Sequence, residues 1–418
     1  MPLNLKSDVA LGLEKLFGAK KPARLGIAVS GGGDSTALLH CLSEWGKTTG
    51  IDLHAITVDH GLRESATEEI RNVAGLCQSL EIPHDVRHWT GWNGEGNLQD
   101  AARRARYGLM AEWAAENEIL DITLGHTLDD QAETVLMRLA RGSGVDGLSG
   151  MAASRSAHGI RWLRPLLGIR RADLRDYLRE NNVTWSEDPS NEDSKFDRIK
   201  TRTALKTLET LGITSERLAD TAIRMTSARQ VLDQSTHAAA QDIAKITAGA
   251  VHLQLDGLFH LPAETRRRLL VHSLSWVASA DYPPRHAALR ELQIALTAQK
   301  TTTLHGCLIS SDSHRCLITR ELSAVSHLAV APDQIWDNRW RMSGPAEAGH
   351  MIRVLGESGL KSCPEWRETG LERAVILASP AVWKNEKLIA APVAGHSNEW
   401  HAELIHNATH FQSSILSH

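Results

Sequence analysis

Six residues near the N-terminus form the strongest chemical signal in the chain. They follow a short apolar run, 25–29, and precede a helix-like run, 36–42. A buried strand that breaks at glycines and enters a helix places backbone N–H groups around an anion, and the helix dipole adds about half a positive charge there. Because no lysine follows the glycines, the Walker type of loop is excluded. We therefore predict a phosphate-binding loop, rather than an ordinary strand–helix turn, from Ser30, Gly31, Gly32, Gly33, Asp34 and Ser35.

The segment 125–134 carries a second group of chemically active side chains. On a helix that turns about 100° per residue, Asp130 lies at about 40° and Glu133 at about −20° from His126, so we expect all three on one face. The opposite, core-facing side receives Leu128, Ala132, Val135, Leu136 and Leu139. Two acids and an imidazole suit either a metal ion or an ammonium group. The alternative is the solvated face of an amphipathic helix.

The first half of the chain supplies elements that can position both groups. Apolar runs at 25–29, 53–58, 84–88 and 119–124 predict strands, and the runs 35–45, 65–80, 97–117 and 128–140 predict helices. Alternating strands and helices imply an α/β fold with a parallel sheet covered by helices on both faces. Ligands of such sheets bind beyond the carboxyl ends of the strands. Ser30, Asp59-His60-Gly61 and Gly125-His126 are all expected at that edge.

The loop 30–35 resembles the pyrophosphate loop of the N-type ATP pyrophosphatases, the PP-loop superfamily. Its members split ATP into AMP and pyrophosphate, adenylate a substrate oxygen and displace AMP with a nucleophile. A longer series of motifs over about residues 22–205 resembles the tRNA(Ile)-lysidine synthetases. It comprises 30–35, 58–63, 96–97, 102–107, 126–134, 141–151, 164–167 and 187–191.

The resemblance implies a ligase of a particular kind. Such enzymes join L-lysine to C2 of the wobble cytidine in the isoleucine tRNA with a CAU anticodon, through an adenylated cytidine, and so change codon reading from AUG to AUA. The implied cofactors are ATP and Mg²⁺, with Asp34 as the expected magnesium ligand. The residues implied to bind ATP are those of the loop 30–35 with His60 and Arg103. The residues implied to bind lysine are His126, Asp130 and Glu133, and those implied in catalysis are Asp34, Asp130, Glu133 and Arg202.

One segment departs from the family pattern. The family continues with Phe, then Arg-Asn, then Ile-Arg; here Phe196 and Arg198 are present, Ile199 replaces the Asn, and Arg202 matches the final Arg. The segment is expected to act as a catalytic loop. Its arginines would stabilise charge on the transferring phosphoryl group.

Bulk properties suit a cytoplasmic protein. The chain has 418 residues, no apolar run approaching the ~20 that a membrane span needs, and no signal-peptide pattern. Its five cysteines have no paired spacing, which favours a reducing compartment. The net charge of −4 does not itself predict an RNA partner, but residues 138–179 hold nine arginines against three acids. We weigh phosphate contacts against a solvated helix face for this segment.

The pattern changes after the first 205 residues. We predict three domains: a catalytic PP-loop domain (1–208), a mainly helical middle domain with a hairpin (209–330), and a small α+β tRNA-binding domain (331–418). Helices are expected at 213–246, as one helix or a broken pair, and at 263–275 and 285–298. Strands are expected at 251–255, 302–310, 315–320, 374–377 and 387–391, with little order after about Ser397. No membrane contact is expected, and a homodimer is compatible with the sequence.

Other functions share some of these sequence features. A tRNA thiolation enzyme would need a Cys-x-x-Cys pair or an iron–sulfur cluster, and the sequence has no such spacing. GMP or NAD synthetases share the loop but do not need the arginine-rich segment. A non-catalytic RNA-binding module could hold zinc through His305, Cys307, His314 and Cys316. For Trp336, Trp340, Trp366 and Trp383, core packing is favoured over base stacking.

Overall fold

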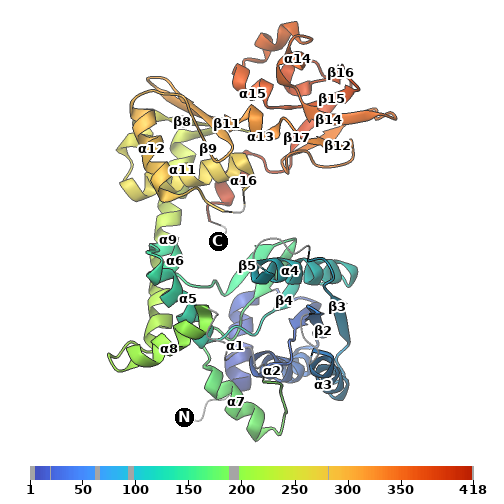
Figure 1. Ribbon diagram of the computed structural model, residues 1–418, viewed down its shortest axis with the longest axis vertical. Helices are drawn as coiled ribbons and strands as arrows, with labels where there is room; N and C mark the ends of the chain where they lie inside the picture. Colours follow the sequence, from blue (N-terminus) through green and yellow to red (C-terminus); the bar gives the residue numbers. More distant parts are fainter. Residues whose placement is uncertain are drawn as a thin grey trace. The chain divides into compact units, whose positions relative to one another are not determined.

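The computed structural model describes residues 5–18, 20–61, 66–92, 98–187, 197–280 and 282–416. The motif residues 62–63, 96–97, 188–191 and Phe196 lie outside these ranges. The chain divides into two compact units, 1–229 and 230–418, and the boundary falls inside the long helix α9 (Ser215–Ile243) (Figure 1). The finer division into three domains stays a prediction.

A parallel sheet forms the centre of the first unit, as predicted. Among the described residues its strand order is β3-β2-β1-β4-β6-β5, with β5 antiparallel at one edge. Strands β2, β1 and β4 are rich in apolar residues because both faces of the sheet are covered. The strands are β1 (Arg24–Ala28), β2 (Asp52–Asp59), β3 (His84–His88), β4 (Asp121–Thr123), β5 (Ser154–Ala157) and β6 (Ile160–Leu163).

Helices cover both faces of this sheet (Figure 1). On one face, α1, α2, α3 and α7 pack on Leu25, Ile27 and Leu53. On the other face, α4 packs through Met110 and Trp113. The helices of the unit before α9 are α1 (Leu5–Phe17), α2 (Gly33–Thr49), α3 (Ala66–Ser79), α4 (Leu98–Glu116), α5 (Leu128–Ala140), α6 (Val145–Leu148), α7 (Arg171–Glu180) and α8 (Asp197–Glu209).

The N-terminal part of the second unit has its own core. Helices α11 and α12 pack with strands β8, β10 and β11, and the C-terminal Phe411 and Ile415 join the same cluster. Its elements are β7 (Ala244–Thr247), β8 (Ala250–Gln254), α10 (Leu255–His260), α11 (Ala263–Ala278), α12 (His286–Thr297), β9 (Thr302–Leu304), β10 (Cys307–Ser311), β11 (Arg315–Arg320) and α16 (Ala408–Ser413).

Residues 322–404 build further clusters around small antiparallel sheets. The core contains Trp336, Trp340 and Trp383, each 5% exposed or less, which confirms the expectation of core packing for these three; Trp366 is half-buried. The elements are α13 (Leu322–Val325), β12 (Ala329–Val330), β13 (Trp340–Ser343), β14 (His350–Val354), α14 (Gly356–Leu360), η2 (Pro364–Thr369), α15 (Arg373–Leu377), β15 (Pro380–Lys384), β16 (Lys387–Ala390), η3 (Pro392–Ala394) and β17 (His401–Leu404).

Three expectations for the second unit are wrong. The strand expected over 302–310 is two strands, β9 and β10, because His305 and Gly306 both have positive φ and form a turn. The run 374–377 lies in the helix α15, since a short apolar run fits a buried helix as well as a strand. The segment after Ser397 forms β17 and α16, because Phe411 gains full burial.

The strand register gives no support to the zinc alternative. Cys307 pairs with Arg320, and Cys316 pairs with Ser311. The two thiols are therefore separated by four register positions, or about 13 Å along the hairpin. Both are buried, and the Cys307 thiol donates to the Leu274 carbonyl at 3.5 Å.

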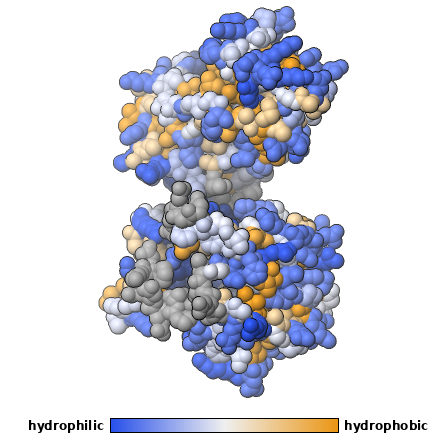
Figure 2. Space-filling model, turned by 45° about the vertical axis from the view of Figure 1, so that its right-hand side comes forward, coloured by the Kyte–Doolittle hydropathy of each residue, from blue (hydrophilic) through white to orange (hydrophobic). Residues whose placement is uncertain are grey.

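Hydrophilic side chains dominate the face drawn in Figure 2, and hydrophobic residues appear there in scattered groups. Within the described ranges, no helix combines the length and the apolar character of a membrane span.

Candidate active site

The predicted phosphate loop connects β1 to α2. Gly31 has φ +84°, a conformation that favours glycine, and it turns the chain between strand and helix. The Ser35 hydroxyl fastens the loop, because it accepts from the Ser30 N–H at 3.1 Å and donates to the Gly32 carbonyl at 3.0 Å. The N-cap of α2 is Gly32, and no side chain caps the helix. The first N–H groups of α2 are thus suited to an anionic ligand.

The second motif packs directly against this loop. A Cβ atom built on Gly125 would lie 3.0 Å from the Ser35 nitrogen and 3.1 Å from its Cα. Only glycine fits this close approach without displacing backbone. The end of β4 and the start of α2 are therefore held in contact, which brings the two predicted motifs together.

A capping box starts α5. Thr127 is the N-cap, and its hydroxyl accepts from the Asp130 N–H at 3.3 Å. In return, Oδ2 of Asp130 accepts from the N–H and the hydroxyl of Thr127, both at 2.9 Å. His126 therefore precedes the helix, and the expectation that it sits on the helical face of Asp130 and Glu133 is wrong. Asp130 and Glu133, three residues apart inside α5, do share a face.

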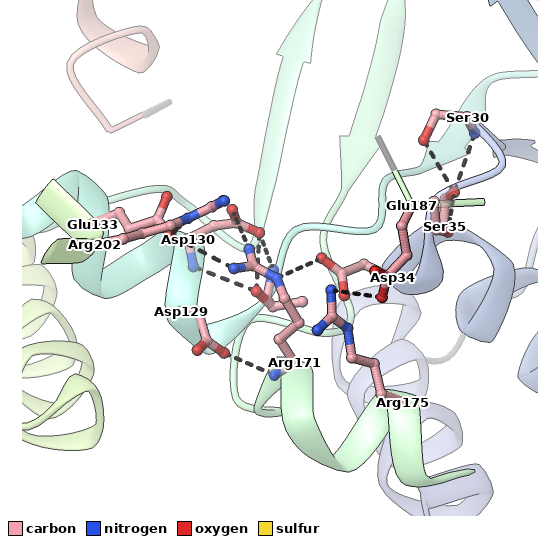
Figure 3. Close-up of polar contacts among 12 residues, drawn as sticks. Ser30, Asp34, Ser35, Asp129, Asp130, Glu133, Arg171, Arg175, Glu187 and Arg202 are labelled. Carbon is pink, nitrogen blue, oxygen red and sulfur yellow. Dashed lines mark hydrogen bonds and ion pairs between the residues drawn. The ribbon is translucent and has the colours of Figure 1, made fainter. Parts of the chain in front are cut away.

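Arg171 joins the two motifs from a third element (Figure 3). It is the first residue of α7, and its backbone N–H donates to Oδ2 of Asp129 at 2.7 Å. Its guanidinium donates to Oδ2 of Asp34 at 3.0 Å and to Oδ1 of Asp130 at 2.9 Å. It also lies 3.6 Å from Oε1 of Glu133. The guanidinium of Arg171 thus contacts Asp34, Asp130 and Glu133, while Asp129 is bound by the backbone.

Glu133 is the most deeply buried acid of this cluster, with 2% of its side chain exposed. Its Oε1 accepts from Nε of Arg202 on α8 at 2.6 Å. Its Oε2 is buried and has no hydrogen-bond partner. Burying a carboxylate oxygen without a hydrogen-bond donor costs free energy, so a hydrogen bond from a ligand to this atom would be favourable.

A cavity of about 1090 Å³ opens at this carboxyl edge of the sheet. Its lining brings together most of the predicted site residues from both motifs. Gly31, Arg103 and Glu133 are not among the described lining residues; Glu133 lies behind Arg171 and Arg202, which both line the cavity. The predicted residues that line it are Ser30, Gly32, Gly33, Asp34, Ser35, His60, His126, Asp130 and Arg202.

Burial and charge give the ionisable groups of the cavity distinct properties. Burial raises the pKa of Asp34, and the guanidinium of Arg171 opposes this shift only in part. Burial also acts on Asp130, but Arg171 and the Thr127 hydrogen bonds outweigh it and hold the Asp130 pKa below its usual value. Burial lowers the pKa of His126 to about 3, so its imidazole is neutral at pH 7.

The structure adds lining residues to which the sequence assigned no individual role. Arg171 and Arg175 come from α7, and Arg106 from α4. Arg106 follows Arg103 by three residues, and burial lowers its pKa. Trp185 lies against Gly33, 3.4 Å from the position of an added Cβ. The excess of arginine over 138–179 was the available signal for α7, but it did not distinguish Arg171 from its neighbours.

Comparisons with known proteins show the family of the chain. A family model described as a PP-loop domain matches residues 5–209. The chain is 47% identical, over 98% of both chains, to a tRNA(Ile)-lysidine synthase of Ruegeria pomeroyi. It is 34% identical, over 90% of both chains, to a tRNA(Ile)-lysidine synthase of Wolbachia pipientis. The chain belongs to the tRNA(Ile)-lysidine synthase family.

Among solved structures, a U34-tRNA thiolase from Methanococcus maripaludis with its [4Fe-4S] cluster matches with a TM-score of 0.46 and 20% identity. The match covers 52% of this chain and 78% of that one.

In the chain itself, several arginines of the segment 138–179 make hydrogen bonds inside the protein. Arg138 donates to the carbonyls of Gly147 and Gly150, both at 2.9 Å. Arg164 is 6% exposed and donates to the Ala152 carbonyl at 2.8 Å. These arginines hold the loop 147–152, so the segment is not simply a solvated helix face.

Proposed function

We propose that this chain ligates L-lysine to C2 of the wobble cytidine of the CAU-anticodon isoleucine tRNA. ATP is the second substrate, and AMP and pyrophosphate are the products. The family membership supports the overall reaction. The observation that carries the proposal is that Ser35 of the phosphate loop and Asp130 of the acidic helix line one cavity. Nucleotide and amino acid can meet there.

The reaction needs two steps, because a carbonyl oxygen is a poor leaving group. First, the C2 oxygen of cytidine attacks the α-phosphorus of ATP, and pyrophosphate leaves. The loop 30–35 would hold the pyrophosphate end through the N–H groups at the start of α2. Arg202 and Arg198 line the cavity and would stabilise the charge on the transferring phosphoryl group.

The second step is attack of the lysine side-chain amine on C2, with release of AMP. That amine has an unperturbed pKa near 10.4, so at pH 7 about one molecule in 10³ is neutral. The site must take a proton from it. Asp130 and Glu133 would bind lysine through its α-ammonium or its ε-amine. The free Oε2 of Glu133 supports a role as acceptor.

The residues present fit a magnesium ion bound together with ATP. Asp34 is a cavity-lining carboxylate whose burial disfavours its charged form, and a cation would relieve that cost. Within the described ranges, no group of three or more acidic, histidine or cysteine side chains could hold a metal alone. This agrees with the use of one or two carboxylates plus phosphate oxygens by Mg²⁺. When bound, the ion would neutralise charge on the pyrophosphate.

The test is transfer of radiolabelled lysine to a transcript of the CAU isoleucine tRNA. We expect incorporation that depends on ATP and releases AMP and pyrophosphate. The control is the same transcript with the wobble cytidine replaced by uridine, which should accept no lysine. Absence of lysine transfer would contradict the proposal, and formation of a sulfur-containing nucleotide would favour thiolation in its place.

Further features extend the proposal to the whole chain. We place tRNA binding in the second unit, where residues 331–418 are the proposed small tRNA-binding domain. A cytoplasmic location fits the five cysteines, all in described segments, which are free and buried. A homodimer remains part of the proposal and is testable by light scattering.

A further inference from the structure

Arg171 stands out because it is a single cation between two subsites. Its contacts reach Asp34, next to the phosphate loop, and Asp130 and Glu133, on the helix proposed to bind lysine. Its side chain is 19% exposed and lines the cavity. An arginine that served only to hold the fold would not need to face the space where both substrates bind.

The backbone of Arg171 is held independently of its side chain. The bond from its N–H to Asp129 fixes the start of α7 against the start of α5. The N-cap Arg170 makes no capping hydrogen bond with its own side chain, so the Asp129 carboxylate holds this end of α7. The guanidinium can therefore change partners without movement of the helix.

From the cavity, a substrate cation reaches the acidic cluster only at the expense of Arg171, because the unpartnered Oε2 of Glu133 is buried and Glu133 is not among the described lining residues. Oδ2 of Asp130 is used in the capping box, and Oδ1 accepts from Arg171. Oε1 of Glu133 contacts both Arg171 and Arg202, and Glu133 does not itself line the cavity. An ammonium group entering from the cavity meets Arg171 in the place where it would bind.

We propose that Arg171 is a positioning residue that couples lysine binding to ATP binding. This inference rests on the proposed function. In the free protein, the guanidinium competes with the lysine ammonium for Asp130 and Glu133. When ATP binds, its phosphates attract the guanidinium toward the loop side, and Asp130 and Glu133 become available to lysine. Lysine thus binds tightly only after ATP.

The coupling is measured as the dissociation constant of radiolabelled lysine, by equilibrium dialysis, with and without a non-hydrolysable ATP analogue and Mg²⁺. For the wild-type chain we expect the analogue to tighten lysine binding about tenfold, a typical size for coupling between sites. By reciprocity, lysine should tighten binding of the analogue by the same factor. Equal lysine affinity in both conditions, or no lysine binding in either, would overturn the inference.

The decisive variant is Arg171→Met, which keeps an unbranched side chain and the backbone bond to Asp129. We expect lysine to bind it without the analogue at least as tightly as it binds the wild type with the analogue. The analogue should then change the lysine affinity of this variant by less than about twofold, which is below the usual range of coupling between two sites. A variant that keeps the full wild-type coupling would overturn the inference.

Two further variants complete the experiment. Arg171→Lys keeps one charge but loses the planar fork that reaches several carboxylates, so it should show intermediate coupling, and wild-type coupling there would count against the inference. It also carries the test if Arg171→Met does not fold. Arg170→Met is the matched control: its side chain pairs with Asp173 at 2.8 Å, and coupling should not change.

Failure of this inference is distinguishable from failure of the proposed function. Lysine transfer to tRNA by the wild-type chain tests the function, whereas the coupling is a binding measurement made without tRNA. Active wild-type protein without coupling would remove the role of Arg171 alone.

Discussion

At the scale of single residues, the site is a balance of opposite charges in a confined space. Asp34, Asp130 and Glu133 converge on Arg171, and Glu133 also contacts Arg202. Removing one partner of such a buried group leaves the others without compensation, which usually costs more than the pair contributes. Substitutions here should therefore have large effects on activity.

Asp34→Ala should abolish adenylation. The carboxylate lines the cavity beside the phosphate loop and is the proposed magnesium ligand. We expect tRNA-dependent ATP–pyrophosphate exchange to fall by about 10²-fold or more, as for the loss of one electrostatic contact in a transition state. Asp176→Ala, at an exposed acid of α7, is the control. Retained exchange would remove Asp34 from the ATP site.

Glu133→Gln should affect lysine transfer more than adenylation. The substitution keeps the shape of the side chain but removes the charge that faces Arg202 at 2.6 Å. Loss of one member of a buried charge pair costs about 2–5 kcal/mol, so lysine transfer should fall by roughly 10²-fold. ATP–pyrophosphate exchange should change only a few-fold. Equal losses in both half-reactions would show that Glu133 does not act on lysine alone.

His126 should make stability depend on pH. Burial lowers its pKa from 6.5 to about 3 in the folded chain, so the unfolded chain binds the proton first. Stability is therefore full above pH 6.5 and falls as the pH drops toward 3. In urea unfolding at pH 7 and pH 5, wild type should lose more stability than His126→Gln. The exposed His286→Gln is the control; parallel losses in wild type and His126→Gln would contradict the argument.

At the scale of elements, the close approach of β4 and α2 sets the geometry of the site. Gly125→Ala places a Cβ atom about 3 Å from the backbone of Ser35, which cannot yield as a flexible side chain would. We expect the KM for ATP to rise about tenfold, in keeping with the cost of overpacking. Gly75→Ala, where an added Cβ meets nothing within 4 Å, is the control. An unchanged KM would show that the loop tolerates displacement.

The elements most accurately predicted from sequence are those whose patterns arise from burial in the sheet. The bounds of β3 and α5 coincide with the predicted ranges. Most of the run 213–246 is one helix, α9, but its last residues belong to the strand β7. The failures came where the deciding contact is distant in sequence. Phe411 is buried by the cluster of α11 and α12, so the local sequence pattern does not predict the C-terminal helix α16. A turn with positive φ at His305 divides the run 302–310, whose sequence predicts one strand.

The residues of the site likewise fall into those that local sequence spacing predicts and those that depend on distant packing. The glycine–serine loop and the pair Asp130 and Glu133 were predicted because their function shows in local spacing. Arg171 was not, since its role depends on how α7 packs, 41 residues after Asp130. Arg103 was expected at the ATP site, whereas Arg106 from the next turn of α4 lines the cavity. Sequence spacing identifies the helix but does not decide which of its turns meets the ligand.

At the scale of the whole molecule, the described residues that line the cavity all belong to the first unit. The phosphate loop, the acidic helix and Arg171 therefore need only residues 1–229 for their mutual contacts. The second unit has separate cores and contributes none of these lining residues. Nucleotide binding and tRNA binding should consequently be separable.

The fragment 1–229 should bind ATP but fail to modify tRNA. We expect its affinity for a non-hydrolysable ATP analogue to stay within a few-fold of the full chain, because the fragment retains the lining residues described for the cavity. Lysine transfer to the tRNA transcript should fall by about 10²-fold or more, since loss of phosphate contacts weakens tRNA binding steeply. Calorimetry and the transfer assay measure the two effects, and circular dichroism verifies folding. A folded fragment that transfers lysine at the full rate would show that the second unit is not needed to hold the tRNA.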